Sequence, residues 1–198
     1  MLKKIGLIGF ADGIGSLIAI LFWFYMAVVL SPEEYGNIFY YLGIVGIISY
    51  FTIIGGQNAI TVYTAKNINI QRTFYLLSLL FSLIAVIVIV SISQRIDIAL
   101  ILLGYIISNL SISYLLGKKL FQKYFIQTLL QKSLLITLGI GFFYIFGTDG
   151  ILYAIGISYL GYTKILYDSF KTSKKDFKFF REHFGFIIND YFMGIINV

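Results

Sequence analysis

Ionisable and amide side chains are rare inside the long apolar runs of this 198-residue chain, and any buried chemistry rests on those few. Asp12 stands between apolar residues near the start, where its carboxylate can bind a coupling proton or cation, or lie solvated at the edge of the apolar run. Gln57 and Asn58 follow two glycines, and Asn109 lies among serines. These amides can bind sugar hydroxyls, cap a helix end or bond a neighbouring helix. Asp190, near the last residue, is the fifth candidate.

Catalytic and metal chemistry finds little support in the sequence. The chain has no cysteine and a single histidine, His183, so it offers no disulfide, no thiolate site and little for a metal cluster. Glu33 and Glu34 belong to a turn, while Asp97 and Asp149 stand alone, and no Gly-rich phosphate loop or His-containing triad occurs. We therefore predict no catalytic residue, no metal and no cofactor, and a membrane-embedded enzyme acting on lipid-linked sugars is the weakest alternative.

The elements that position these residues are predicted to be transmembrane helices. Apolar residues make up 59% of the chain and charged residues 12%, well below the charged share of soluble domains. About 20 uncharged residues suffice for a helix to cross about 30 Å of hydrocarbon. Six runs approach that length: residues 13–31, 35–65, 73–94, 98–117, 133–148 and 150–163. The predicted fold class is an all-α, polytopic helix bundle with six complete spans, with the N-terminus as a retained first span and no signal peptide.

Two of the six runs are short, and helical segments at their lysine-bearing ends extend them. Lys132 and Lys164 can stretch from those ends toward the headgroups. Before the fifth run, "KKLFQKYFIQTLLQK" alternates apolar and polar positions with a period near four, which predicts a helix that enters along the membrane interface. In this interpretation no lysine or arginine lies at the midplane of any span.

Basic residues set the orientation. With a cytoplasmic N-terminus and six spans, the outer loops hold only Arg95 among the 15 lysines and arginines. This asymmetry satisfies the positive-inside rule, so the net charge of +6 reflects membrane topology and not affinity for nucleic acid.

The stretch "SPEEYG", residues 31–36, is predicted to be the first outer turn. Ser31 can cap the second helix, Pro32 suits its first position and Glu34 completes a capping box. The carboxylates of Glu33 and Glu34 also lie favourably at the positive end of that helix.

The same stretch carries a resemblance to a known family. Leu30, Pro32, Tyr35 and Gly36 form an "L-x-P-x-x-Y-G" pattern, a later segment reads "GGQNAI", and residues 146–160 read "FGTDGILYAIGISYL". The chain resembles the N-terminal half of the polysaccharide flippases, the Wzx-type O-antigen and lipid-linked oligosaccharide transporters of the multidrug/oligosaccharidyl-lipid/polysaccharide exporter superfamily. This resemblance implies two pseudo-symmetric helical halves around a central cavity, in the cell (plasma or inner) membrane.

We expect three segments on this basis: a six-helix transmembrane half at 1–168, a basic cytoplasmic linker at 169–183, and the start of a truncated seventh helix at 184–198. The last segment suggests a fragment whose C-terminal half is missing. The implied partners are membrane lipids, a lipid-linked oligosaccharide, that missing half, a glycan polymerase and glycosyltransferases, with no nucleic acid.

The implied substrate, an oligosaccharide on polyprenyl pyrophosphate, has an anionic headgroup that needs cations. Basic contacts must come from residues at the inner ends of the spans, and the candidates are Lys4, Lys66, Arg72 and Lys164. The two halves would rock between inward-open and outward-open states and carry the headgroup across. The alternatives are another exporter of the same superfamily, a drug or cation antiporter, and a nonfunctional truncated fragment.

Overall fold

The computed structural model covers the whole chain and describes residues 2–173, 176–182, 184–185, 187–189 and 191, with the side chains of 2–5 and 179 left out. All regular structure in these residues is helical, which confirms the predicted all-α class. The helices are α1 (Leu2–Val29), α2 (Pro32–Ile53), α3 (Gly56–Ala65), α4 (Gln71–Ser93), α5 (Ile96–Gly117), α6 (Phe121–Phe146), α7 (Thr148–Leu160), α8 (Thr163–Thr172) and α9 (Phe177–Glu182).

Five of the described helices are long and apolar enough to cross a membrane by length and composition: α1 from Gly6, α2, α4, α5 and α6. Large apolar side chains are exposed along them, for example Val28 at 85% and Ile92 at 80%. Such a surface is unusual for a protein in water and normal for one in lipid. The five helices indicate a multi-pass membrane protein.

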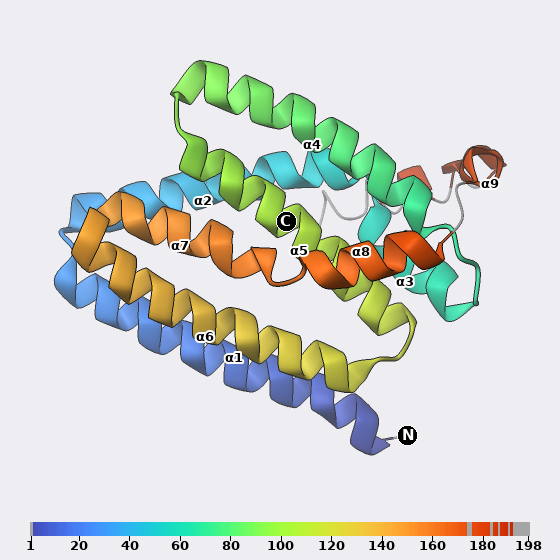
Figure 1. Cartoon of the computed structure of the whole chain (residues 1–198), viewed down its shortest axis with the longest axis horizontal. Helices are drawn as coiled ribbons and strands as arrows, with labels where there is room; N and C mark the ends of the chain where they lie inside the picture. The colour runs from blue at the N-terminus through green and yellow to red at the C-terminus, as the bar shows by residue number, and fades with distance from the viewer. Residues whose placement is uncertain (1, 174–175, 183, 186, 190, 192–198) are drawn as a thin grey trace.

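Helix α5 lies at the centre of the bundle (Figure 1). Within its apolar window 61% of the residues are buried, compared with 17% in α1, α4 and α6. Helices α2, α3, α4, α6, α7 and α8 contact it, and α1 packs against α6 along one side of the bundle (Figure 1). Those two helices run parallel, because Asp12 contacts Tyr124 near their starts and Tyr25 contacts Tyr144 near their ends.

The turn at residues 31–36 forms as predicted. Ser31 is the N-cap of α2, its backbone N–H donates to the Glu34 carboxylate at 2.9 Å, and the Glu34 N–H donates to the Ser31 hydroxyl at 3.3 Å. Pro32 opens the helix, where its missing N–H costs nothing. This capping box fixes the point at which the chain reverses from α1 into α2.

The predicted spans need three corrections. The second, 35–65, is not one helix, because the chain breaks at Ile54 and Gly55 between α2 and α3. The fifth, 133–148, belongs to a helix that starts 12 residues earlier, at Phe121. The sixth, 150–163, is split, since α7 has 13 residues, about 20 Å of helix, and a turn at Gly161 and Tyr162 separates it from α8.

Most charged residues of the described helical bundle gather at its two ends, and Asp12 and Lys132 lie between them. The end where α1, α4 and α6 finish holds Glu33, Glu34, Arg95, Asp97 and Asp149, and we call it the Arg95 end. The opposite end, where α3 and α5 finish, holds Lys66, Arg72, Lys118, Lys119 and Lys123, and we call it the lysine-rich end. This separation agrees with the alternation on which the predicted orientation depends.

Candidate functional site

The break between α2 and α3 is the main irregularity inside the bundle. Ile54 and Gly55 both adopt left-handed backbone conformations, with φ values of 48° and 64°. A β-branched residue rarely does so, which marks the break as a strained feature that the surrounding structure holds in place. A Cβ atom at Gly55 would lie 2.7 Å from the Ile187 carbonyl oxygen, so only glycine allows this approach. The break therefore turns the chain and also seats the segment after α9 against it.

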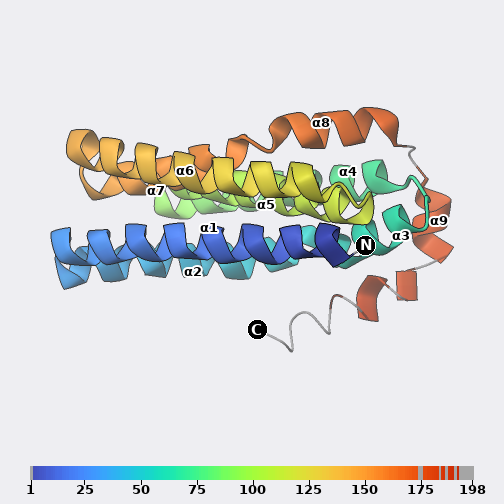
Figure 2. The ribbon, with the colours of Figure 1, turned by 90° about the horizontal axis from the view of Figure 1, so that it is seen from below.

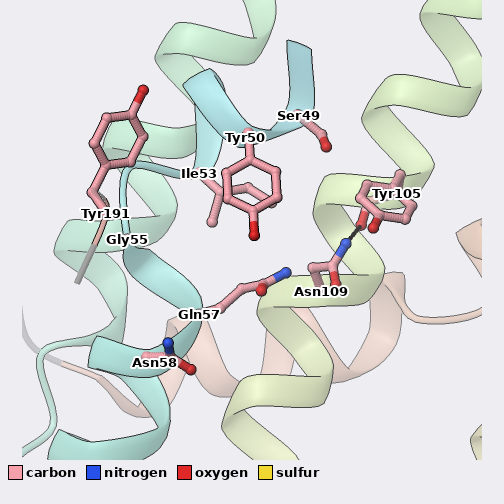
Figure 3. Close-up of a pocket in the computed structure, with 9 residues that line it drawn as sticks. All are labelled: Ser49, Tyr50, Ile53, Gly55, Gln57, Asn58, Tyr105, Asn109 and Tyr191. Carbon is pink, nitrogen blue, oxygen red and sulfur yellow. Dashed lines mark hydrogen bonds between the residues drawn. The ribbon is translucent and has the colours of Figure 1, made fainter. Parts of the chain in front are cut away.

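A cavity of about 190 Å³ opens beside this break (Figure 3). Its walls come from the end of α2, the start of α3, the middle of α5 and one residue beyond α9. The lining residues are Ser49, Tyr50, Ile53, Gly55, Gln57, Asn58, Tyr105, Asn109 and Tyr191. None of these side chains is charged at neutral pH, so the cavity offers hydroxyls, amides and aromatic faces to an uncharged polar group.

Three predicted site residues thus lie on one cavity although 52 positions separate the first from the last in sequence. The Gln57 amide extends from α3 toward Asn109 on α5 (Figure 3) and makes no hydrogen bond within the described residues. The Asn109 amide donates to the Tyr105 carbonyl of its own helix at 2.9 Å and bonds no neighbouring helix in the part of the chain that the structure describes. The N-cap of α3 is Gly55, so the amides of Gln57 and Asn58 do not occupy that position. Asp190 lies outside the described residues.

Asp12 lies elsewhere, in the seam where α1 packs on α6. Its carboxylate is exposed and accepts a hydrogen bond from the hydroxyl of Tyr124, which is buried. The contact with Tyr124 of α6 could not be predicted from the order of residues. Asp12 is therefore neither a cavity residue nor a free solvated carboxylate in the described structure.

The α1–α6 seam also contains Lys132, which the sequence analysis placed at the end of a span. Because α6 begins at Phe121, Lys132 lies near the middle of this 26-residue helix, and the prediction that no basic residue lies at mid-span is wrong. The predicted interfacial helix is wrong for the same reason: Gln131 and Thr128 are buried inside the bundle, while Ile126 and Leu130 are exposed. The buried side of α6 combines polar Thr128 and Gln131 with apolar Tyr124 and Leu135.

The predicted headgroup contacts do not converge on the cavity. Lys66 is exposed at the end of α3, and Lys164 is exposed in the first turn of α8. Arg72 is half-buried near the start of α4, with its guanidinium 4.6 Å from the centre of the Phe170 ring. The side chain of Lys4 is outside the described part of the chain.

Arg95 organises a charged cluster that the sequence analysis missed. Asp97 and Asp149 do not stand alone, because Arg95 forms ion pairs with both, at 2.6 Å in the case of Asp97. The Arg95 guanidinium also lies 4.7 Å from the centre of the Tyr41 ring. Hydrogen bonding to Asp97 raises the pKa of Arg95 above its already high ordinary value, so the cation persists at every pH at which the protein can be handled.

Metal binding finds no support in the described residues, which contain no group of three or more histidine or acidic side chains placed to hold an ion.

Comparison of the chain with protein-family models, curated proteins and solved structures gives no match. The functional argument therefore rests on the broken helix, its neutral cavity and the polar seam.

Proposed function

We propose that this chain is a multi-pass transporter of the cell membrane that moves a polyprenyl-pyrophosphate-linked oligosaccharide by alternating access. The observation that carries the proposal is the break between α2 and α3 within a membrane-length segment, with a polar cavity beside it. Irregular backbone at membrane depth is tolerated where it lines a cavity, and broken helices in transporters mark substrate sites.

The chemistry of the cavity suits sugar. Amides both donate and accept hydrogen bonds to hydroxyl groups, and Tyr50 and Tyr105 present aromatic faces. With about 190 Å³ the cavity is smaller than the roughly 300 Å³ at which drug-sized sites begin. It therefore accommodates a single small group, such as one ring of the oligosaccharide, while the rest of the headgroup lies outside it.

The proposed topology has six crossings and a cytoplasmic N-terminus. Helices α7 and α8 follow one another, with only Gly161 and Tyr162 between them (Figure 2). Together residues 148–172 provide about 37 Å of chain at helical rise, which is enough for the sixth crossing. This arrangement leaves the lysine-rich end inside and the Arg95 end outside.

In this mechanism the pyrophosphate is recruited by basic residues at the lysine-rich end, with Lys66, Arg72 and Lys164 as the proposed contacts. The lipid tail remains in the bilayer while one sugar enters the cavity and bonds to Gln57 and Asn109. Rocking against a second lobe, as the family resemblance implies, then exposes the headgroup to the other side.

A transport assay in reconstituted vesicles tests the proposal, and α5 offers a matched control. Asn109 and Ser108 both donate to the Tyr105 carbonyl, at 2.9 and 2.8 Å, but only Asn109 lines the cavity. Asn109→Ala should reduce translocation of a fluorescent lipid-linked oligosaccharide about three- to tenfold, the equivalent of one hydrogen bond. Ser108→Ala should leave it unchanged. Equal rates in both variants would contradict the cavity as the sugar site.

A cation antiporter of the same superfamily is the second candidate, and the observation in its favour is Asp12. Its exposed carboxylate on a membrane-length helix is a place where a transported or coupling cation could bind. Asp12→Asn would abolish ion-driven drug efflux if this candidate were right, whereas Asn109→Ala would affect it little.

A further inference from the structure

Lys132 occupies a position that its charge makes costly. At 1.5 Å per residue it lies about 16 Å beyond the start of α6 and about 21 Å before its end. The hydrocarbon core extends about 15 Å on either side of its midplane, and a lysine stem is too short to carry the ammonium from there to the headgroups. A charge in such a place needs a partner from the protein.

The packing of Lys132 indicates where that partner is. Its stem lies against Gly15 of α1: a Cβ atom built on Gly15 would be 3.5 Å from the Lys132 Cγ atom and 3.9 Å from its Cε atom. The ammonium is bonded to that Cε atom, so it lies close to this turn of α1. Gly15 comes three residues after Asp12, which is less than one turn of helix.

Asp12 is the acid available to Lys132, although the two side chains form no ion pair within 4.0 Å in the described structure. On α1, α6 and α7, the described acidic residues are Asp12 and Asp149, and Asp149 pairs with Arg95 at the end of the bundle. The other titratable groups that face Asp12 are the phenols of Tyr124, which donates to it, and Tyr162, which lies within range of its charge. A carboxylate has about four lone-pair sites, so Tyr124 leaves room for a second partner.

We propose that Lys132 is the built-in counter-ion of Asp12, and that it takes the electrostatic place of a bound metal cation in the α1–α6 seam. The seam is then neutral with no ion present, and its carboxylate has no site for sodium, which argues against Asp12 as the cation site of the second candidate function. This inference rests on α1 and α6 crossing a bilayer, as in the proposed function, but it requires no transported substrate.

Thermal unfolding of the purified full chain in lipid nanodiscs tests the proposal, with sodium chloride compared with choline chloride at equal ionic strength. The wild type should melt at the same temperature in both salts. Lys132→Met removes the counter-ion, so in choline the variant should melt below the wild type. In sodium the same variant should melt about 2–4 °C higher than in choline, which corresponds to about 1 kcal/mol for a chain of this size.

Three further variants separate pairing from a general loss of packing. Lys132→Arg keeps a cation and should not respond to sodium. The double variant Asp12→Asn with Lys132→Met leaves neither charge unpaired, so it should lose the sodium response and melt above either single variant in choline. Lys123→Met removes an exposed lysine from the same helix and should match the wild type.

Two results would overturn the proposal. One is a wild type that sodium stabilises over choline, because the seam would then hold the ion that Lys132 is said to replace. The other is additive behaviour of the Asp12 and Lys132 variants, which would mean that the two side chains do not interact. Both readouts are made without an oligosaccharide lipid, so failure of the transport proposal would leave them unaffected.

Discussion

The Arg95 cluster and the cavity at the α2–α3 break are both polar regions in an apolar bundle, but they satisfy their polar groups differently. Arg95 joins the turn before α5 to the first turn of α7 and to Tyr41 of α2, and both carboxylates in reach accept from it. At the cavity, the side-chain amide of Gln57 makes no hydrogen bond within the described residues, and the Asn109 amide uses only one donor, to its own helix.

This difference separates a structural role from a binding role. Polar groups that already have partners gain little from a ligand, whereas groups that face a cavity with unused hydrogen-bonding capacity can be satisfied by one. The cluster therefore links the start of α5 to α7 and α2, and the cavity is the place where a ligand is expected. Variants of the cluster should change stability and leave ligand affinity unchanged, whereas variants of the cavity should change ligand affinity.

The largest expected effect comes from Asp97→Ala. The Asp97 side chain is 3% exposed and receives two bonds from Arg95, so its loss leaves a partly buried guanidinium with one partner. Removing one member of such a pair costs about 3 kcal/mol. Thermal unfolding should show this loss, while binding of the oligosaccharide lipid by the folded fraction should keep its wild-type affinity.

Asp149→Asn is the matched control at the same arginine. Its side chain is 61% exposed, and an ion pair with that exposure contributes about 0–1 kcal/mol. If Asp97→Ala and Asp149→Asn destabilise the protein equally, then burial does not determine how much each ion pair of Arg95 contributes to stability. That result would contradict a structural role for the buried pair.

A smaller effect, about 2 kcal/mol, is expected for Gly55→Ala. Alanine at a φ of 64° costs about 1–2 kcal/mol, and its Cβ atom would approach the Ile187 carbonyl oxygen to 2.7 Å. The seated segment must shift, so affinity for the oligosaccharide lipid should fall together with the melting temperature. This combination distinguishes a cavity variant from Asp97→Ala.

Gly46→Ala tests whether any added methyl group in the same segment has this effect. Gly46 lies inside α2, where a Cβ atom would meet no atom within 4 Å. Alanine favours the helix there, so neither stability nor affinity should decrease. A loss at Gly46 as large as that at Gly55 would show that the break has no special geometry.

Sequence patterns were sufficient to predict features that depend on residues close together along the chain. The capping box of Ser31 and Glu34 forms because both partners lie within one turn, and the long apolar runs became helices because backbone groups in lipid must bond within their own segment. The amides of the candidate site were also found, since polar residues inside apolar runs are rare.

Features that depend on contacts between distant segments were missed. Nothing in the order of residues indicates that Arg95 reaches Asp149, 54 positions away, or that Tyr124 meets Asp12. The position of Lys132 was misjudged because a window of uncharged residues ends at any lysine, whereas α6 continues through it, with Gln131 and Thr128 buried beside it. The break at Ile54 had only the following glycines as a signal, and the predicted second span, 35–65, ran through them.

A loss of about 1 kcal/mol at pH 7, smaller than that of Asp97→Ala or Gly55→Ala, is expected for Arg95→Lys, because a lysine keeps the charge but loses the forked geometry that bonds both Asp97 oxygens. Asp97 raises the pKa of Arg95, so the arginine's contribution is present below the pKa of the unfolded chain and is lost only as pH rises through a still higher value. The wild-type cluster should therefore survive at pH 11. A lysine has an ordinary pKa of about 10.4, so its contribution should decline above that pH. The difference in melting temperature between the two proteins should be constant from pH 7 to 9 and widen above about pH 10.4; a constant difference up to pH 11 would mean that Arg95 does not hold the cluster by its charge.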